Sequence, residues 1–268
     1  INNSRSVKVA YVDNKCKFFN VFHLNVQSIR KKIEMLELLL ESLNCSILTL
    51  NEHWLVVEES QLFVPQGYSL ANIYCRKPPL TRGGCSIFVK NGLDYQPIDL
   101  EKFCIDTVFE VTAVLLSKTN IIVATIYRTP GLDLDCFLSS LDSCVGFLYK
   151  KYPSRHIIIS GDFNIDILKD DLNTTNLLNT LRSLNLYCLN HEPTRNVACL
   201  DNIVTNMFKN DIECQIIEPH ISDHSGILAV FYDFMGNDPN KQTYFKRMKD
   251  LTPKAIRNFR MVLSEVDW

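Results

Sequence analysis

Side chains able to do acid–base or metal chemistry follow an apolar run near the middle of the chain. The run His156–Ile159 predicts a buried strand, and Gly161 is then expected to make a tight turn. This places Asp162 and Asn164 two residues apart at the carboxyl end of the strand. In open α/β architectures, ligands and chemistry collect at that end. An Asx-turn that merely closes a strand explains the same residues equally well.

The same pattern recurs elsewhere along the chain. Asn25, Glu52 and Tyr127 each end an expected strand, Asp201 begins a later one, and Ser222–His224 lies just before the last. Each of these residues alone is explained by a turn, a cap or a half-buried core position. Their coincidence at one edge of a fold predicts a common site.

The residue types in this set suit metal-assisted hydrolysis of a phosphodiester. Glu52, with amide oxygens from Asn25 and Gln27, offers part of the oxygen shell that Mg²⁺ favours, and Mn²⁺ is the alternative ion. Such an ion acts as a Lewis acid toward phosphate and the leaving oxygen. Asp223 suits a second metal position or a contact with the leaving group.

The remaining members of the set suit proton transfer and charge stabilisation. Asp162, beside Asn164, is expected to position and deprotonate the attacking water. His224 needs a second group to fix its tautomer, and Asp201 is the candidate. This pair would stabilise the phosphate as an imidazolium or act as a general base. Tyr127 is expected to hydrogen-bond the phosphate or to assist the leaving group.

Several other function classes fit the sequence less well. Ser222–His224 has the residue types of a serine triad, but adjacent residues cannot adopt triad geometry. Gly83 and Gly84 match neither the phosphate-binding loop nor the dinucleotide-binding pattern. The ten cysteines are scattered without metal-ligand spacing, which is typical of small core residues in a reducing compartment. A net charge of −2 gives no global sign of nucleic-acid binding, and no long apolar segment predicts a membrane span.

Hydrophobic periodicity predicts the elements that would position the site. Helices are expected from an N-cap at Ser28 to Leu43, over Asp133–Lys151 and over Thr174–Leu184. Strands are expected over Phe18–Asn25, Ser46–Leu50, Tyr68–Tyr74, Cys85–Lys90, Phe109–Leu116, Ile121–Tyr127, His156–Ile159, Leu200–Asn206, Ile212–Ile217 and Gly226–Phe231. So many strands favour an α/β fold of two sheets packed face to face with helices on their outer faces.

The ordered motifs resemble those of the endonuclease/exonuclease/phosphatase family over about Phe18 to Tyr232. The motifs concerned are Asn25, Glu52, Tyr127, Gly161–Asn164, Asp201 and Ser222–His224. Within that family, three segments are similar to the apurinic-like endonuclease domain of non-LTR retrotransposons, particularly insect-type elements. These segments are Asn51–Leu55, Arg82–Gly84 and Tyr127–Pro130.

The resemblance implies a four-layer αββα sandwich of two mixed sheets and Mg²⁺-dependent nicking of double-stranded DNA. The nick would leave a 3′-hydroxyl that primes reverse transcription of the element's RNA in the nucleus. Glu52 would be the main metal ligand with Asn25 close by, and Asp223 would be auxiliary. Residues 1–17 would then be a lead-in, 18–235 the catalytic domain, and 236–268 a basic linker toward a reverse transcriptase.

Target DNA would be held by basic side chains near the edge of the site. Arg82, Arg128 and Arg195 are the candidates, although surface charge or internal ion pairs explain them equally well. Two other functions stay open from the sequence. One is a phosphoesterase of the same fold that acts on a small phosphorylated substrate, and the other is a nucleic-acid-binding domain whose nuclease activity has decayed.

Overall fold

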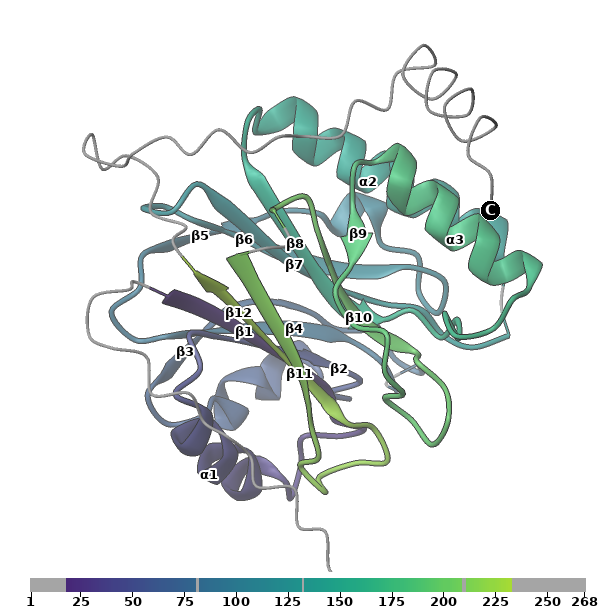
Figure 1. The fold of residues 1–268 in the computed structure, drawn as a ribbon. Coiled ribbons are helices and arrows are strands. Elements are labelled where there is room, and N and C mark those ends of the chain that lie inside the picture. The colour runs from purple at the N-terminus through teal and green to yellow at the C-terminus, as the bar shows by residue number, and fades with distance from the viewer. Residues whose placement is uncertain (1–17, 81, 132, 209–210, 233–268) are drawn as a thin grey trace, which may run out of the picture. The chain divides into compact units, whose positions relative to one another are not determined.

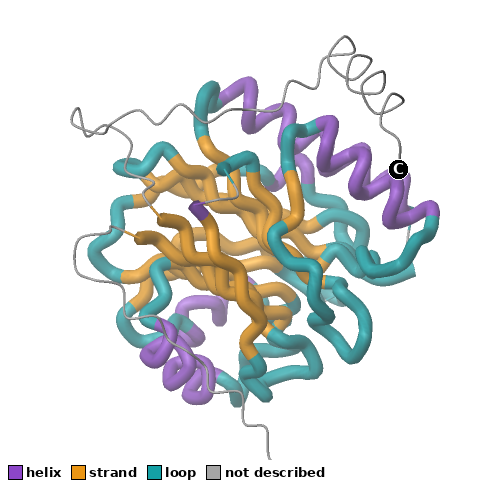
Figure 2. Tube along the Cα trace, viewed as in Figure 1, coloured by secondary structure: helices purple, strands orange, loops and turns teal. Residues whose placement is uncertain are grey.

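The fold consists of two mixed six-stranded sheets packed face to face between helices (Figure 1). The computed structural model of the chain describes residues 18–80, 82–131, 133–208 and 211–232. Figure 2 shows the strands in the middle and the helices at the outer faces. The predicted αββα sandwich is confirmed.

The first sheet combines strands from both ends of the described chain. Its order is β11-β12-β1-β2-β4-β3, with β1 and β2 parallel and the other pairs antiparallel. Its strands are β1 (Phe18–Asn25), β2 (Ile47–Asn51), β3 (Tyr68–Tyr74), β4 (Cys85–Lys90), β11 (Ile212–Ile217) and β12 (Gly226–Tyr232). Helix α1 (Ile33–Leu43) covers its outer face, and the 3₁₀ helix η1 (Val57–Phe63) follows β2.

The second sheet is built from the middle of the chain in the order β5-β6-β7-β8-β10-β9, with β7 and β8 parallel. Its strands are β5 (Tyr95–Ile98), β6 (Glu110–Leu116), β7 (Ile121–Tyr127), β8 (His156–Asp162), β9 (Tyr187–Cys188) and β10 (Asp201–Thr205). Helices α2 (Leu134–Lys151) and α3 (Leu172–Ser183) cover its outer face, and the 3₁₀ helix η2 (Glu101–Phe103) follows β5.

Burial on both faces explains why the central strands are nearly continuous apolar runs. Every residue of β6 and β7 is buried, as expected for strands covered on both sides. One apolar cluster lies between the two sheets, and one lies under the helices of each sheet. The cysteines of the described ranges, from Cys45 to Cys214, all have free thiols.

Two local predictions are wrong, namely the N-cap at Ser28 and the tight turn at Gly161. Helix α1 begins at Ile33 with Lys32 at its N-cap, and Ser28 adopts a φ of 74° in the turn before it. Gly161 does not make a turn, because β8 continues through it to Asp162. A Cβ at Gly161 would come within 2.1 Å of the Ile126 carbonyl oxygen on β7. Glycine is therefore required by the close approach of two neighbouring strands.

Most predicted strands are confirmed to within one or two residues, whereas β5 and β9 were not predicted. Both are short, and Pro97 lies inside β5. The predicted segments 1–17 and 236–268 lie outside the described residues, so the domain boundaries stay predictions. Within the described ranges, none of the helices has the length and apolarity needed to cross a membrane.

Candidate active site

The layer between the sheets changes from apolar to polar toward one end of the strands. On β1 the inward positions pass from Phe19 and Val21 to His23 and Asn25, because alternate residues of a strand share one face. Strands β2, β8 and β10 show the same change, and their polar inward residues are Thr49, Asn51, Ser160, Asp162 and Asp201. Buried polar residues thus collect at one end of the sandwich.

Strand register brings the predicted residues of the second sheet side by side. Tyr127 and Asp162 are partners at the carboxyl ends of the parallel strands β7 and β8. Asp201 opens β10, which runs antiparallel to β8, so Asp201 pairs directly with Asp162. The carboxyl ends of two strands and the amino end of a third therefore meet.

Asn25 joins the two sheets at this end. Its Nδ2 donates to Glu52 Oε1 (2.8 Å) and to Asp162 Oδ2 (2.9 Å), while its Oδ1 accepts from the backbone N–H of Gln27. The amide nitrogen, and not the amide oxygen, thus faces the two carboxylates. The metal-ligand role of Asn25 stays a prediction.

Glu52 is held at the end of β2 with a left-handed φ of 53°. Its Oε2 accepts from the indole N–H of Trp54 (3.1 Å). Burial raises the pKa of Tyr127 well above its usual range, and the nearby carboxylates Glu52 and Asp162 raise it further. Tyr127 therefore keeps its proton and can donate a hydrogen bond.

Asp162 is a buried carboxyl group with donors on several sides. Its Oδ1 accepts from the backbone N–H of Asn164 (2.9 Å), and its own N–H donates to Asn51 Oδ1 (2.8 Å). Burial, with a further contribution from Asp201, raises the pKa of Asp162 to about 8. A carboxyl group of this kind can exchange a proton near neutral pH.

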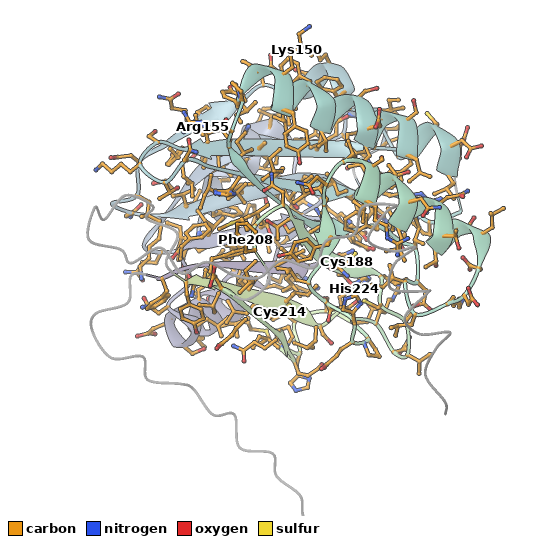
Figure 3. All side chains as sticks on the ribbon, turned by 45° about the horizontal axis from the view of Figure 1, so that its top comes forward. Lys150, Arg155, Cys188, Phe208, Cys214 and His224 are labelled. Carbon is orange, nitrogen blue, oxygen red and sulfur yellow. The ribbon has the colours of Figure 1, made fainter. Side chains whose placement is uncertain are left out.

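His224 and Asp201 form a buried pair next to Asp162 (His224 is labelled in Figure 3). The His224 Nδ1 lies 2.8 Å from Asp201 Oδ2. Burial opposes the charge on His224, but the bond to Asp201 outweighs it and raises the pKa of His224 to about 9. Burial likewise opposes the charge on Asp201, but the bond from His224 and the nearby His23 imidazole outweigh it, so the pKa of Asp201 lies well below its usual range.

The other ring nitrogen of His224 has no hydrogen-bond partner among the described residues. Asp223 Oδ1 lies 3.9 Å from this Nε2. One ligand atom from each of Asp162, Asp201 and His224 lies within 4.8 Å of the others. The three residues are called the buried triad below.

Charged residues at the rim of the site are much more exposed. Asp223 accepts from Arg195 (2.6 Å), and the two side chains are 49% and 36% exposed. The guanidinium of Arg82 lies 5.4 Å from the centre of the Trp54 ring. These side chains are placed to meet a ligand that approaches from solvent.

Arg128, the third predicted DNA contact, lies lower in the site. It is only 6% exposed, and its guanidinium stacks over Phe137. Its Nη1 donates to the carbonyl of Asn164 (3.3 Å), and Asn164 Nδ2 donates to the carbonyl of Arg128 (2.6 Å). These contacts fix the loop after β8, and a contact of Arg128 with DNA stays a prediction.

The sequence reasoning missed several buried polar residues beneath the site. His23 faces Asp201, and Asn51 orients the backbone at Asp162. Arg76 forms a buried ion pair with Glu110 and lies 5.6 Å from the Tyr127 ring centre. His23 and Asn51 had a signal that could have been used, because each shares the inward face of its strand with apolar residues.

The residues present fit a hard divalent cation. Glu52 and Asp162 are carboxylates held close together by the Asn25 amide, and such oxygens are the ligands that Mg²⁺ and Mn²⁺ accept. Each Glu52 oxygen accepts from a protein donor and keeps a further lone pair.

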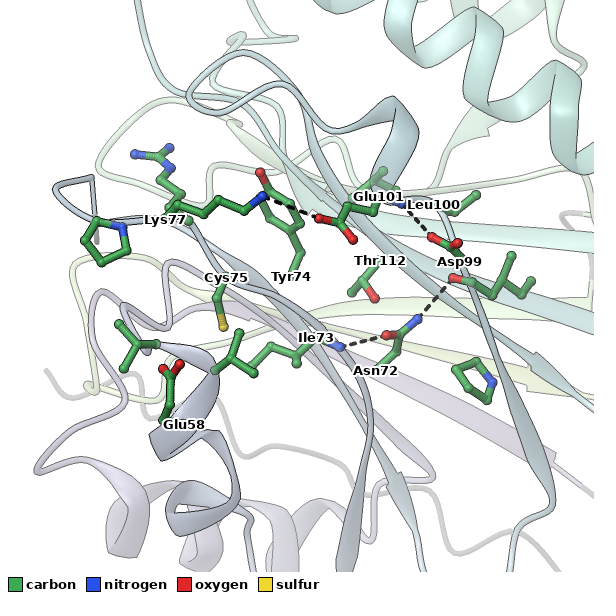
Figure 4. Close-up of a pocket in the computed structure, with 17 residues that line it drawn as sticks. Glu58, Asn72, Ile73, Tyr74, Cys75, Lys77, Asp99, Leu100, Glu101 and Thr112 are labelled. Carbon is green, nitrogen blue, oxygen red and sulfur yellow. Dashed lines mark hydrogen bonds and ion pairs between the residues drawn. The ribbon is translucent and has the colours of Figure 1, made fainter.

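A separate pocket of about 580 Å³ lies away from this cluster (Figure 4). It is lined by residues of η1, β3, β5 and η2, with Lys77 and Glu101 facing each other at 3.8 Å. None of Asn25, Glu52 or the buried triad lines it. The size of this pocket therefore does not indicate where the candidate catalytic residues lie.

Comparison with known proteins gives the same class of fold. No protein-family model matches the sequence, and no curated protein matches it either. The two-sheet fold is that of solved structures of endonuclease/exonuclease/phosphatase family proteins. Identities to these and the following structures are 20% or less, so the similarity establishes the fold.

Three structures illustrate the range of proteins with this fold. The endonuclease domain of TRAS1, a telomere-specific non-LTR retrotransposon, is 20% identical with a TM-score of 0.60, covering 80% of this chain and 98% of its own. The AP endonuclease LMAP from Leishmania major is 15% identical with a TM-score of 0.61, covering 80% and 88%. The 3′ phosphatase NExo from Neisseria, bound to a product DNA hairpin, is 16% identical with a TM-score of 0.61, covering 80% and 99%.

Proposed function

We propose that the protein is a Mg²⁺-dependent DNA endonuclease, with Mn²⁺ as an alternative ion, that nicks double-stranded DNA and leaves a 3′-hydroxyl. One observation supports this most directly. The buried triad of Asp162, Asp201 and His224 lies next to a Glu52 carboxylate that Asn25 ties to Asp162, and His224 Nε2 has no hydrogen-bond partner in the described part of the chain. Carboxylates beside an imidazolium are the groups that hydrolysis of a phosphodiester needs.

Each side chain has a role that follows from its contacts. Asp201 holds His224 as an imidazolium. The His224 Nε2–H, which has no partner among the described residues, donates to a phosphate oxygen on which negative charge grows. Asp162 in its ionised form takes the proton of the attacking water, because a raised pKa makes the carboxylate a stronger base. Asn25 and the Asn164 N–H keep its oxygens in place.

The remaining groups hold the cation and the leaving oxygen. When bound at Glu52 with Asp162 nearby, Mg²⁺ supplies Lewis-acid stabilisation of the phosphate and the leaving oxygen. Trp54 orients the Glu52 carboxylate by a hydrogen bond. Tyr127 stays protonated and can donate a hydrogen bond. Asp223 acts as an auxiliary group at the rim.

DNA is the proposed substrate because the exposed part of the site is basic and aromatic. Arg195 and Arg82 lie at the rim, and Arg82 stacks on Trp54. Arginines at such positions bind phosphates and fix the register of a duplex. The structural similarity to the TRAS1 endonuclease domain supports a role in a retroelement. There the nick would prime reverse transcription of element RNA by a linked reverse transcriptase in the nucleus.

Conversion of supercoiled plasmid to relaxed circles in the presence of Mg²⁺ tests this function. We expect nicking by the wild-type protein and loss of nicking in Asp162→Ala and His224→Ala. Nicking by the wild type should persist when EDTA is added together with excess Mg²⁺. His156→Ala is the matched control, because His156 begins the strand that Asp162 ends. Priming of a DNA polymerase at the nick, without phosphatase treatment, would identify the 3′-hydroxyl.

The outcomes separate the proposal from its rivals. Nicking that is equal in the two triad variants, or absent in the wild type, contradicts the proposed function. Release of phosphate from a small phosphorylated substrate without nicking favours a phosphoesterase, as the similarity to the NExo phosphatase also would. DNA binding without cleavage favours a decayed binding domain.

A further inference from the structure

His23 is a fully buried histidine that the proposed reaction leaves without a role. It lies on β1, two residues before Asn25, and faces the second sheet. Its Nε2 is 3.6 Å from Asp201 Oδ1. Within the described ranges, neither of these two buried atoms has a hydrogen-bond partner at normal distance. The two atoms therefore face each other at a distance slightly longer than a hydrogen bond.

The Asp201 carboxylate thus lies between two imidazoles. His224 Nδ1 approaches Oδ2 at 2.8 Å, while His23 faces Oδ1. Since an ionised carboxylate only accepts hydrogen bonds, His23 must present an N–H at Nε2. Contacts on both oxygens restrict rotation of the carboxylate about the Cβ–Cγ bond of Asp201. A single contact at Oδ2 would not restrict this rotation.

His23 is itself held from the opposite side by hydroxyl groups. Its Nδ1 lies 3.2 Å from Thr49 Oγ1 on β2, and Ser160 Oγ on β8 donates to that hydroxyl at 2.8 Å. This series of contacts crosses from the first sheet to the second. It therefore ties the position of Asp201 to the packing of both sheets.

The position would otherwise favour an apolar side chain. Val21, the preceding inward residue of β1, belongs to the cluster between the sheets. A buried polar group costs free energy unless it is hydrogen-bonded. A histidine here makes physical sense when its N–H is needed by the carboxylate that orients His224.

We propose that His23 is a positioning residue that fixes the plane of the Asp201 carboxylate and so aims His224 Nε2 at the phosphate. The contacts of His23 are observed in the structure, whereas the expected effect on nicking rests on the proposed function. Residues that orient a catalytic ligand or base from behind typically change activity by about 10- to 100-fold when they are replaced.

Three substitutions of His23 test the positioning role, because they differ in how far a side-chain N–H donor extends toward Asp201. The amide nitrogen of His23→Gln extends to about where Nε2 lies, whereas His23→Asn is too short and His23→Leu has no donor. For plasmid nicking we expect kcat to fall about 10- to 100-fold in His23→Leu and His23→Asn with KM unchanged. His23→Gln should recover most of the rate. If His23→Leu does not fold, the comparison of the two amides still decides.

Asn20→Ala controls for a general loss of stability in β1. Asn20 is buried on the same strand and bonds the backbone N–H of Ser46, without touching Asp201. We expect a lower Tm and an unchanged kcat. Equal kcat in His23→Asn, His23→Gln and wild type, while His224→Ala is inactive, would overturn the positioning role.

Nuclear magnetic resonance of the metal-free protein gives a readout that does not depend on activity. The ring N–H of His224 that bonds Asp201 should give a low-field proton resonance in the wild type and in His23→Gln. In His23→Asn this resonance should shift or broaden as Asp201 gains freedom. An unchanged resonance would overturn the inference, whether or not the wild type cuts DNA. A wild-type protein that cuts no DNA would contradict the proposed function alone.

Discussion

Two carboxylates adjacent to His224 in space have very different surroundings. Asp201 is fully buried and bonds His224 at 2.8 Å, whereas Asp223 is 49% exposed and pairs with Arg195 at the rim. Charges in a low-dielectric interior interact strongly, while exposed pairs are weakened by water and salt. Burial therefore makes the interaction between Asp201 and His224 strong and suits this pair to chemistry. Exposure leaves the second pair available to a partner.

The largest effect should come from removing a buried carboxylate. Asp162→Asn keeps the shape of the side chain but removes the proposed base, so kcat for plasmid nicking should fall by about 10³-fold. Single-turnover rates at saturating DNA provide the measurement. A rate within about threefold of the wild type would assign the chemistry elsewhere.

Replacement of Glu52 should weaken the response to metal. In Glu52→Gln one anionic oxygen is lost, so the Mg²⁺ concentration for half-maximal nicking should rise by about tenfold or more. Asp223→Asn, at the rim, should change it much less. A larger shift in Asp223→Asn than in Glu52→Gln would reverse the assignment of the principal metal ligand.

The buried pair should also make stability depend on pH. The pKa of His224 is raised from 6.5 to about 9. The contribution of His224 to the stability of the folded protein is therefore present below pH 6.5 and is lost as the pH rises to about 9. Over this window, the free energy of unfolding of the metal-free protein should fall by on the order of 2 kcal/mol.

Denaturant titrations at several pH values would measure this loss. The raised pKa of Asp162 acts in the same direction, so His224→Gln should show a smaller loss and not none. Arg195→Ala, which removes the exposed pair, should retain the full loss. An equal pH dependence in His224→Gln and wild type would show that the buried pair does not hold a proton.

The smallest effects on the folded protein should come from the rim. Arg195→Ala should change the free energy of unfolding by less than about 1 kcal/mol, because exposed ion pairs contribute little. Each of Arg82→Ala and Arg195→Ala should weaken DNA binding and lower the slope of log affinity against log salt by about 0.9. Fluorescence anisotropy over a range of salt concentrations measures this slope. An unchanged slope would remove these residues from the DNA contact.

The sequence predicted what strand periodicity and strand ends determine. The segments Tyr68–Tyr74, Ile121–Tyr127 and Ile212–Ile217 are strands with the predicted bounds, since apolar runs between turn residues define them locally. The sequence points to Asp162 and Asp201 because polar residues at strand ends are expected to meet. Their direct pairing across β8 and β10 was beyond the sequence, because register depends on both strands.

The features that the sequence missed depend on contacts distant in the chain. The role of Gly161 follows from Ile126 on the neighbouring strand, and that of His23 follows from Asp201, far along the chain. The exposure of a charged side chain was equally hidden, since Arg128 and Arg195 look alike in sequence but differ in burial. Tertiary packing alone distinguishes such residues.

The single-turnover nicking rates of His224→Gln and Arg195→Gln at saturating DNA and Mg²⁺ test most directly whether the buried triad, and not the rim, performs the chemistry. We expect His224→Gln to be slower than the wild type by about 10³-fold and Arg195→Gln to remain within about threefold. Equal losses in the two variants, or a larger loss in Arg195→Gln, would contradict the account.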